Sequence, residues 1–164
     1  MRIAYFSPLN PQKSGISDYS ERLLQALSKF AKIDLWVEGF MPSNLEIASR
    51  FTIIDYVNQP SKLEELKNYD EIIYNIGNNP HYHSHTYDVF LKYNGIVILH
   101  ELVLYYLITG YYLDFKNSKD LYLQELEYNH GQYGIDEGQK ILKSSVPPLQ
   151  FSRPETLPLN KRII

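Results

Sequence analysis

The sequence predicts an α/β fold, a Rossmann-like parallel sheet with helices on both faces. Short apolar runs of strand length alternate along the chain with segments that carry the apolar spacing of one helix face. The run at residues 95–99 is apolar at consecutive positions after its glycine, as in strands that are covered on both sides. Strands that alternate with helices form βαβ units, and such units assemble into a parallel sheet.

Each expected element follows from its own residues. Strands are expected at residues 2–6, 33–37, 51–55, 71–76 and 95–99. The first helix follows a turn-rich loop, Ser14 or Ser17 can cap it, and its apolar residues are Ile16, Tyr19, Leu23, Leu24, Leu27 and Phe30. Further helices are expected at residues 62–67, 83–93, 102–113, 121–128 and 135–142. His130, Gly131 and Gly134 predict a break between the last two.

The length predicts one domain, followed by a short segment of different composition. At about 150 residues per domain, the chain is long enough for a proper core. We place this domain at residues 1–143. Residues 144–164 contain four prolines within a dozen positions and are expected to form a Pro-rich linker or tail, with Lys161 and Arg162 as solvated charges.

The composition excludes several classes of function. Without cysteine there is no disulfide framework, thiolate zinc site, iron–sulfur cluster or cysteine nucleophile, and a reducing, cytoplasmic setting is expected. The formal charge of −3 is not that of a dedicated nucleic-acid binder, so no nucleic-acid partner is expected. Fifteen tyrosines suit a sugar or a lipid–water boundary, which leaves peripheral contact with the inner face of the membrane open.

The loop after the first strand is the first candidate site, because open parallel sheets bind ligands outside the carboxyl ends of their strands. Ser14, Gly15 and Ile16 stand where this loop enters the first helix. A glycine allows close approach to the backbone, and the N–H groups of a helix N-terminus attract a phosphate. The alternative is that Gly15 only permits a tight turn, because the loop carries neither a full dinucleotide fingerprint nor a P-loop.

The loop after the fourth strand, residues 75–83, combines glycine, asparagine, proline and histidine. Asn78 and His81 can hydrogen-bond the hydroxyl groups of a polyol. The spacing of His81, His83 and His85 also permits a metal site, but a helix starting here would separate His83 from the other two.

The pair His100 and Glu101 follows the last strand and is the best single candidate for chemistry. An imidazole near neutrality can hydrogen-bond a substrate oxygen or exchange a proton. The nearby tyrosines 105, 106, 111 and 112 are expected to pack in the core rather than to form a binding platform.

With these residues in order, the chain resembles the N-terminal domain of a retaining glycosyltransferase of the GT-B fold, family four. The resemblance covers about residues 1–143 and rests on Tyr5-Phe6-Ser7-Pro8 through Ser14–Ser20, on Asn75-Ile76-Gly77-Asn78 followed by His81, and on Gly95–His100. The block Tyr128–Gly138 is similar as well. The family usually has aspartate after the histidine, where this chain has the longer Glu101.

This resemblance implies the first of two Rossmann-like domains that face each other across a cleft, with the C-terminal donor-binding domain absent from this chain. The reaction would move a sugar from a nucleotide-diphosphate sugar to a hydroxyl acceptor with retention, without an obligatory metal or cofactor. His100 would be catalytic, and the donor diphosphate would meet Ser14, Gly15 and Ile16. Acceptor-binding residues would be Asn78, His81 and Glu101. The acceptor would be a saccharide, a lipid-linked sugar or a small molecule, and the isolated domain would be inactive.

Two other functions remain open at this point. One is a stand-alone, non-catalytic module that binds a sugar, a nucleotide or a protein partner. The other is a metal-dependent hydrolase built on His81, His83 and His85.

Overall fold

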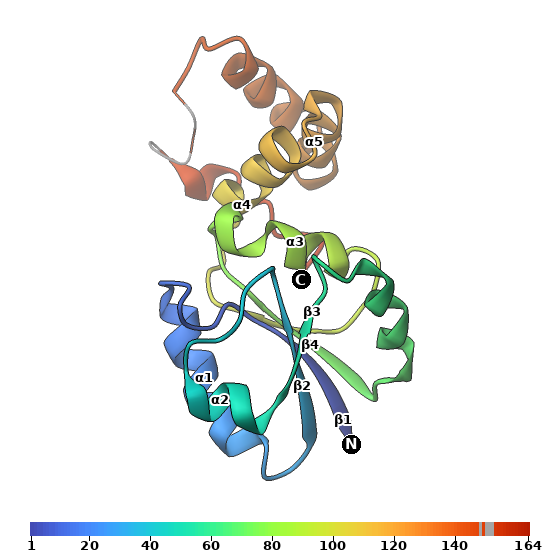
Figure 1. The fold of residues 1–164 in the computed structure, drawn as a ribbon. Coiled ribbons are helices and arrows are strands. Elements are labelled where there is room, and N and C mark those ends of the chain that lie inside the picture. Colours follow the sequence, from blue (N-terminus) through green and yellow to red (C-terminus); the bar gives the residue numbers. More distant parts are fainter. Residues whose placement is uncertain (148, 150–152) are drawn as a thin grey trace. The chain divides into compact units, whose positions relative to one another are not determined.

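The chain divides into two compact units in the computed structural model, which describes residues 1–147, 149 and 153–164 (Figure 1). Unit 1 comprises residues 1–76 and 85–100, and unit 2 comprises residues 77–84 and 101–164. The boundary after Ile76 has no counterpart in the sequence prediction, which placed residues 1–143 in one domain.

Unit 1 is built on a parallel sheet, as the sequence predicts. Its strands are β1 (Arg2–Phe6), β2 (Lys32–Val37), β3 (Thr52–Asp55), β4 (Glu71–Ile76) and β5 (Ile96–Leu99). All neighbouring pairs are parallel, and the strand order is β3-β2-β1-β4-β5. This is the order of the first five strands in a Rossmann-like sheet, so the α/β prediction is confirmed.

Helical segments connect these strands and flank the sheet. In chain order they are α1 (Gly15–Leu27), α2 (Leu45–Arg50), the 3-10 segment η1 (Pro60–Asn68) and α3 (Pro80–Phe90). Right-handed crossovers place α1 and α2 on one face and η1 and the unit 1 part of α3 on the other. Helix α2 was not expected from the sequence. Its signal was Asn44, whose side-chain oxygen accepts hydrogen bonds from the N–H groups of Glu46 and Ile47.

Burial along the sheet distinguishes its centre from its edge. Residues 3–6 of β1 and 33–37 of β2 are buried at consecutive positions, so these strands are covered on both faces. The same expectation for β5 is wrong, because β5 is an edge strand and Ile96 remains 51% exposed. The single tryptophan, Trp36, lies in the core of unit 1 against Phe6.

Helix α1 packs through Ile16, Leu23, Leu24 and Leu27 as the sequence predicts, but not through Tyr19 and Phe30. Its buried side chains include Ser17 and Ser20, whereas Tyr19 is 43% exposed and Phe30, beyond the helix, is 79% exposed. The Ser20 hydroxyl lies 2.7 Å from Ser7 Oγ and accepts a hydrogen bond of 3.2 Å from Tyr5. Because these hydroxyls have partners, serine can occupy the packed face and bring the helix close to the sheet.

Unit 2 is helical. It contains α4 (Tyr105–Gly110), the π-helical turn η2 (Tyr111–Phe115), the long α5 (Lys119–Leu142), the 3-10 turn η4 (Pro154–Thr156) and residues 80–84 of α3. Gly131 interrupts α5 with a φ of 61°, which confirms the predicted break. Tyr105, Tyr111 and Tyr112 are buried as expected, but Tyr106 is 42% exposed. Among the described residues, no helix combines the length and the apolar character that a membrane crossing requires.

The last residues of the chain pack within unit 2. Leu157 and Leu159 are buried, and the Pro158 carbonyl accepts a hydrogen bond of 2.7 Å from the N–H of Leu104. Arg162 donates to Glu125, a carboxylate only 1% exposed, at 2.6 Å. Arg162 is 37% exposed, as a solvated charge would be, but the sequence did not predict that it pairs with a buried carboxylate.

Candidate functional site

The candidate site lies at the carboxyl edge of the unit 1 sheet, beside the point where the strand order reverses. The chain leaves β1 in one direction and returns as β4 on the other side of it, and ligands of such sheets bind outside the strand ends at this position. Phe6, the last residue of β1, pairs with Tyr74, so Asn75 and Ile76 of β4 extend beyond β1.

Asn75 and His100 form the polar centre of this edge. Asn75 is fully buried, and its Nδ2 donates a hydrogen bond of 3.2 Å to the carbonyl oxygen of Phe6. Its Oδ1 lies 3.2 Å from Nε2 of His100. His100 follows β5 directly, and its backbone N–H donates to the Ile76 carbonyl at 2.9 Å. Both the backbone and the ring of His100 are thus held by β4.

Tyr19 connects this histidine to the N-terminal turns of α1. Its ring lies 4.9 Å from the His100 ring, centroid to centroid, at an interplanar angle of 81°. Tyr19 also lines an open pocket of about 540 Å³ together with Gly15, Asp18, Arg22 and Leu23. The structure therefore brings His100 and Gly15, which are far apart in the sequence, to the same aromatic neighbour.

The N-terminus of α1 is capped by Ser14, one of the two caps predicted. Ser14 Oγ accepts a hydrogen bond of 3.2 Å from the N–H of Ile16, so this N–H is engaged, and the Ile16 side chain is buried. Ser17 instead donates its hydroxyl to the Gln12 carbonyl at 2.7 Å. Of Ser14, Gly15 and Ile16, Gly15 alone is exposed.

Gly15 has no structural requirement to be glycine. It is exposed, it is the first residue of the helix, and no described atom lies within 4 Å of the position that a Cβ would take. A tight turn that only glycine permits would show a left-handed φ or crowding around the missing Cβ. The backbone therefore does not support the alternative that Gly15 is needed only to form a tight turn.

The predicted acceptor-binding residues all lie in unit 2, whereas His100 and Gly15 lie in unit 1. Asn78 Oδ1 accepts hydrogen bonds of 3.0 Å from the N–H groups of Tyr106 and Leu107, and so caps the first turn of α4. His81 is exposed beside Tyr82, and Glu101 is exposed. Their role in binding an acceptor stays a prediction.

The three neighbouring histidines fall within α3, which starts at Pro80. Helix geometry places His81 and His85 on one face and His83, only 1% exposed, on another. Over residues 1–147, 149 and 153–164, no three His, Cys, Asp or Glu side chains are arranged to hold a metal ion. The geometry therefore gives no argument for the metal-dependent hydrolase.

Glu38 is a residue of the carboxyl edge that the sequence analysis missed. It follows β2 directly, and its Oε1 accepts hydrogen bonds from the Tyr56 hydroxyl at 3.0 Å and from the Thr86 hydroxyl and N–H at 2.6 and 3.0 Å. Burial raises the pKa of Glu38 to about 7, although these donors oppose the shift. The sequence feature that could have indicated Glu38 is an acidic residue directly after the apolar run at residues 33–37.

Asn75 and Tyr19 were not among the predicted site residues either. An asparagine next to the end of the apolar run 71–76 was a usable signal, because a buried amide must find partners. For Tyr19 the sequence predicted burial rather than a place in a site, because its spacing is that of the packed face of the helix.

Comparison of the chain with known protein families, with curated proteins and with solved structures finds no match.

Proposed function

We propose that this chain is the N-terminal, acceptor-side domain of a retaining glycosyltransferase that moves a sugar from a nucleotide-diphosphate sugar to a hydroxyl acceptor. The observation that carries the proposal is the anchored His100 at the switch point of a Rossmann-like sheet, with Tyr19 linking it to the exposed Gly15. Retention and the GT-B arrangement rest on the resemblance of the sequence blocks.

In this proposal Gly15 is the point of contact with the donor diphosphate. The first N–H groups of a helix have no intrahelical partner, and the helix dipole favours an anion there. Without a side chain at Gly15, a phosphate can reach the backbone, and no structural need explains the glycine otherwise.

His100 hydrogen-bonds the transferred sugar or its phosphate near the reacting centre. A group fixed in this way loses little freedom when the substrate binds, and preorganised groups contribute most to transition-state stabilisation. The contacts with Asn75 and Ile76 supply this fixation. Asn78, His81 and Glu101 are proposed to line the acceptor side.

The proposed reaction requires a second domain to grip the nucleotide and close the cleft, because donor and acceptor must be positioned together and shielded from water. Unit 1 alone is therefore expected to bind nucleotides weakly. The proposed setting is cytoplasmic, with the acceptor a saccharide, a lipid-linked sugar or a small molecule.

The test begins with binding. Amide spectra of the ¹⁵N-labelled chain are recorded with pyrophosphate, with UDP, GDP and ADP, and with their glucose conjugates. We expect shifts at Gly15, Tyr19 and His100. Signals that move only in unit 2, or not at all, would contradict the donor assignment.

The second step measures transfer by the full-length native protein to a panel of hydroxyl acceptors, with NMR of the anomeric proton to read the stereochemistry. Retention of configuration supports the proposal and inversion overturns it. Saturable binding of a nucleotide or sugar without any transfer would favour the stand-alone binding module.

A further inference from the structure

The orientation of the Asn75 side chain can be assigned from chemistry alone. The atom of its carboxamide that faces the Phe6 carbonyl oxygen, at 3.2 Å, must be the amide nitrogen, because a carbonyl oxygen cannot donate a hydrogen bond. The carboxamide oxygen is therefore the atom that faces His100.

This orientation decides where the proton of His100 lies. An amide oxygen only accepts, so Nε2 of His100, 3.2 Å away, must carry a hydrogen to make this contact. Turning the ring by 180° would place a carbon against Oδ1 and lose the hydrogen bond. The contact thus selects one ring orientation as well as one tautomer.

We propose that Asn75 is a positioning residue that holds neutral His100 as the Nε2–H tautomer, so that any proton His100 accepts arrives at Nδ1. The backbone hydrogen bond from His100 to Ile76 and the edge contact with Tyr19 restrain the same ring. The tautomer stands on this geometry alone, whereas its consequence for sugar transfer rests on the proposed function. In the neutral form His100 accepts a hydrogen bond through Nδ1, and only the protonated ring donates through both nitrogens.

The direct test is a long-range ¹H–¹⁵N spectrum of the histidine rings above the pH at which they titrate. His100→Gln, whose amide can still donate to Asn75, assigns the His100 signals by their loss. We expect Nε2 to show the shift of a protonated ring nitrogen and Nδ1 that of an unprotonated one. The opposite pattern, or an averaged pair of shifts, overturns the proposal.

Two variants of Asn75 separate positioning from a structural role. Asn75→Asp gives up the hydrogen bond to the Phe6 carbonyl, but it keeps an oxygen acceptor for Nε2 and adds a negative charge. The Nε2–H tautomer therefore persists, and the pKa of His100 rises by about one unit or more. Asn75→Ala removes the acceptor, and the two nitrogen shifts of His100 move toward each other. The exposed His81, read in the same spectra, is the internal control and keeps its shifts and titration.

If Asn75→Ala fails to fold, which the fluorescence of Trp36 reports, Asn75→Asp alone still decides the matter. An unchanged His100 titration in that variant would overturn the proposal. These spectra need no activity, so a correct tautomer with no sugar transfer refutes only the proposed function. Transfer by a protein whose His100 carries its proton on Nδ1 refutes only the role of Asn75.

Discussion

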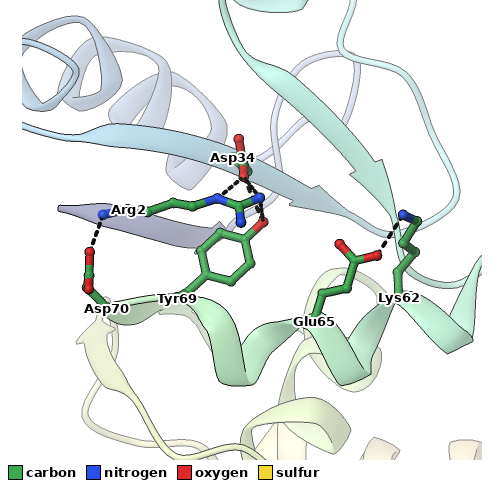
Figure 2. A network of polar contacts seen from close by, with 6 residues as sticks. All are labelled: Arg2, Asp34, Lys62, Glu65, Tyr69 and Asp70. Carbon is green, nitrogen blue, oxygen red and sulfur yellow. Dashed lines mark hydrogen bonds and ion pairs between the residues drawn. The ribbon is translucent and has the colours of Figure 1, made fainter.

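The two ends of the unit 1 sheet carry buried polar groups of different kinds. At the amino edge, Asp34 is 1% exposed, and its Oδ2 accepts hydrogen bonds from Arg2 Nε at 2.9 Å, Arg2 Nη2 at 2.7 Å and the Tyr69 hydroxyl at 2.7 Å (Figure 2). The Arg2 guanidinium also lies 4.2 Å from the Tyr69 ring centroid. At the carboxyl edge, a neutral amide faces an imidazole near an exposed glycine.

The comparison indicates that this sheet has its stabilising buried ion pair at one edge and its candidate binding groups at the other. The opposite charges of the amino edge are paired through Asp34 Oδ2. Burial raises the pKa of Asp34, but the hydrogen bonds from Tyr69 and Arg2 outweigh burial and hold this pKa below its usual value. At the carboxyl edge the buried amide of Asn75 is uncharged, so it can remain near a strand end with hydrogen-bond partners and without a counter-ion.

Breaking the amino edge is expected to produce the largest effect. Arg2→Met leaves the buried Asp34 carboxylate without its cation, which destabilises unit 1 by about 3 kcal/mol at pH 7. Urea unfolding followed by the fluorescence of Trp36 measures this loss. The pKa of Asp34 is lower in the folded state than its ordinary 3.8, so its contribution to stability is present above pH 4. The loss of stability caused by Arg2→Met becomes smaller as the pH falls through the folded pKa of Asp34.

The matched control for Arg2→Met is Lys62→Met. Lys62 and Glu65 also form an ion pair, but both side chains are more than 40% exposed (Figure 2). Removing an exposed pair changes stability by about 0.5 kcal/mol or less. Equal losses of stability in Arg2→Met and Lys62→Met would show that burial of Asp34 does not strengthen the contribution of its ion pair.

His100→Ala tests the carboxyl edge, where we expect a large catalytic loss with the fold intact. In the full-length protein, turnover falls by about a hundredfold or more, because a positioned imidazole contributes at least this factor. The chain still folds, but it loses about 1 kcal/mol of stability because the buried Asn75 oxygen loses its partner. Wild-type turnover in this variant would refute the catalytic assignment, and Lys62→Met serves as the active control.

Glu38→Gln is expected to stabilise unit 1 at high pH, in contrast to changes at Asp34. The folded pKa of Glu38, about 7, exceeds its ordinary 4.5, so its contribution to stability is complete below 4.5 and is lost as the pH rises through 7. The uncharged amide avoids this loss and gains about 2 kcal/mol at pH 8. Urea midpoints from pH 4 to pH 8 follow the gain.

The control here is Glu64→Gln, since the Glu64 side chain is 75% exposed. A pH profile of Glu38→Gln parallel to that of the control would mean that Glu38 is solvated in the folded protein.

The smallest effects are expected at Gly15. Gly15→Leu raises the dissociation constant for a nucleoside diphosphate about tenfold, because the side chain occupies the approach to the helix N-terminus. Gly15→Ala stabilises the chain by about 0.5 kcal/mol, since its Cβ meets no described atom within 4 Å. Calorimetric titration measures the dissociation constant of Gly15→Leu, and thermal melts measure the stability of Gly15→Ala. Unchanged affinity in Gly15→Leu would remove Gly15 from the site.

Local patterns predicted most of the fold. The strands, the cap at Ser14 and the break at Gly131 each depend on residues close together in the sequence. The placement of His100 directly after β5 has the same origin, because an apolar run and the polar residue that ends it can be read along the chain.

The sequence by itself determined the α/β class, the alternation of strands and helices, and the loops where a ligand of such a sheet would bind. Only the tertiary structure decided which polar groups meet: Asn75 with His100, 25 residues apart, and Glu38 with Thr86, 48 residues apart. It also decided that the packed face of α1 extends to Ser17 and Ser20 rather than to Tyr19, because buried hydroxyl pairs such as Ser7 with Ser20 satisfy each other there. The physical reason is that periodicity encodes local burial, whereas the pairing of distant polar groups depends on strand order and register.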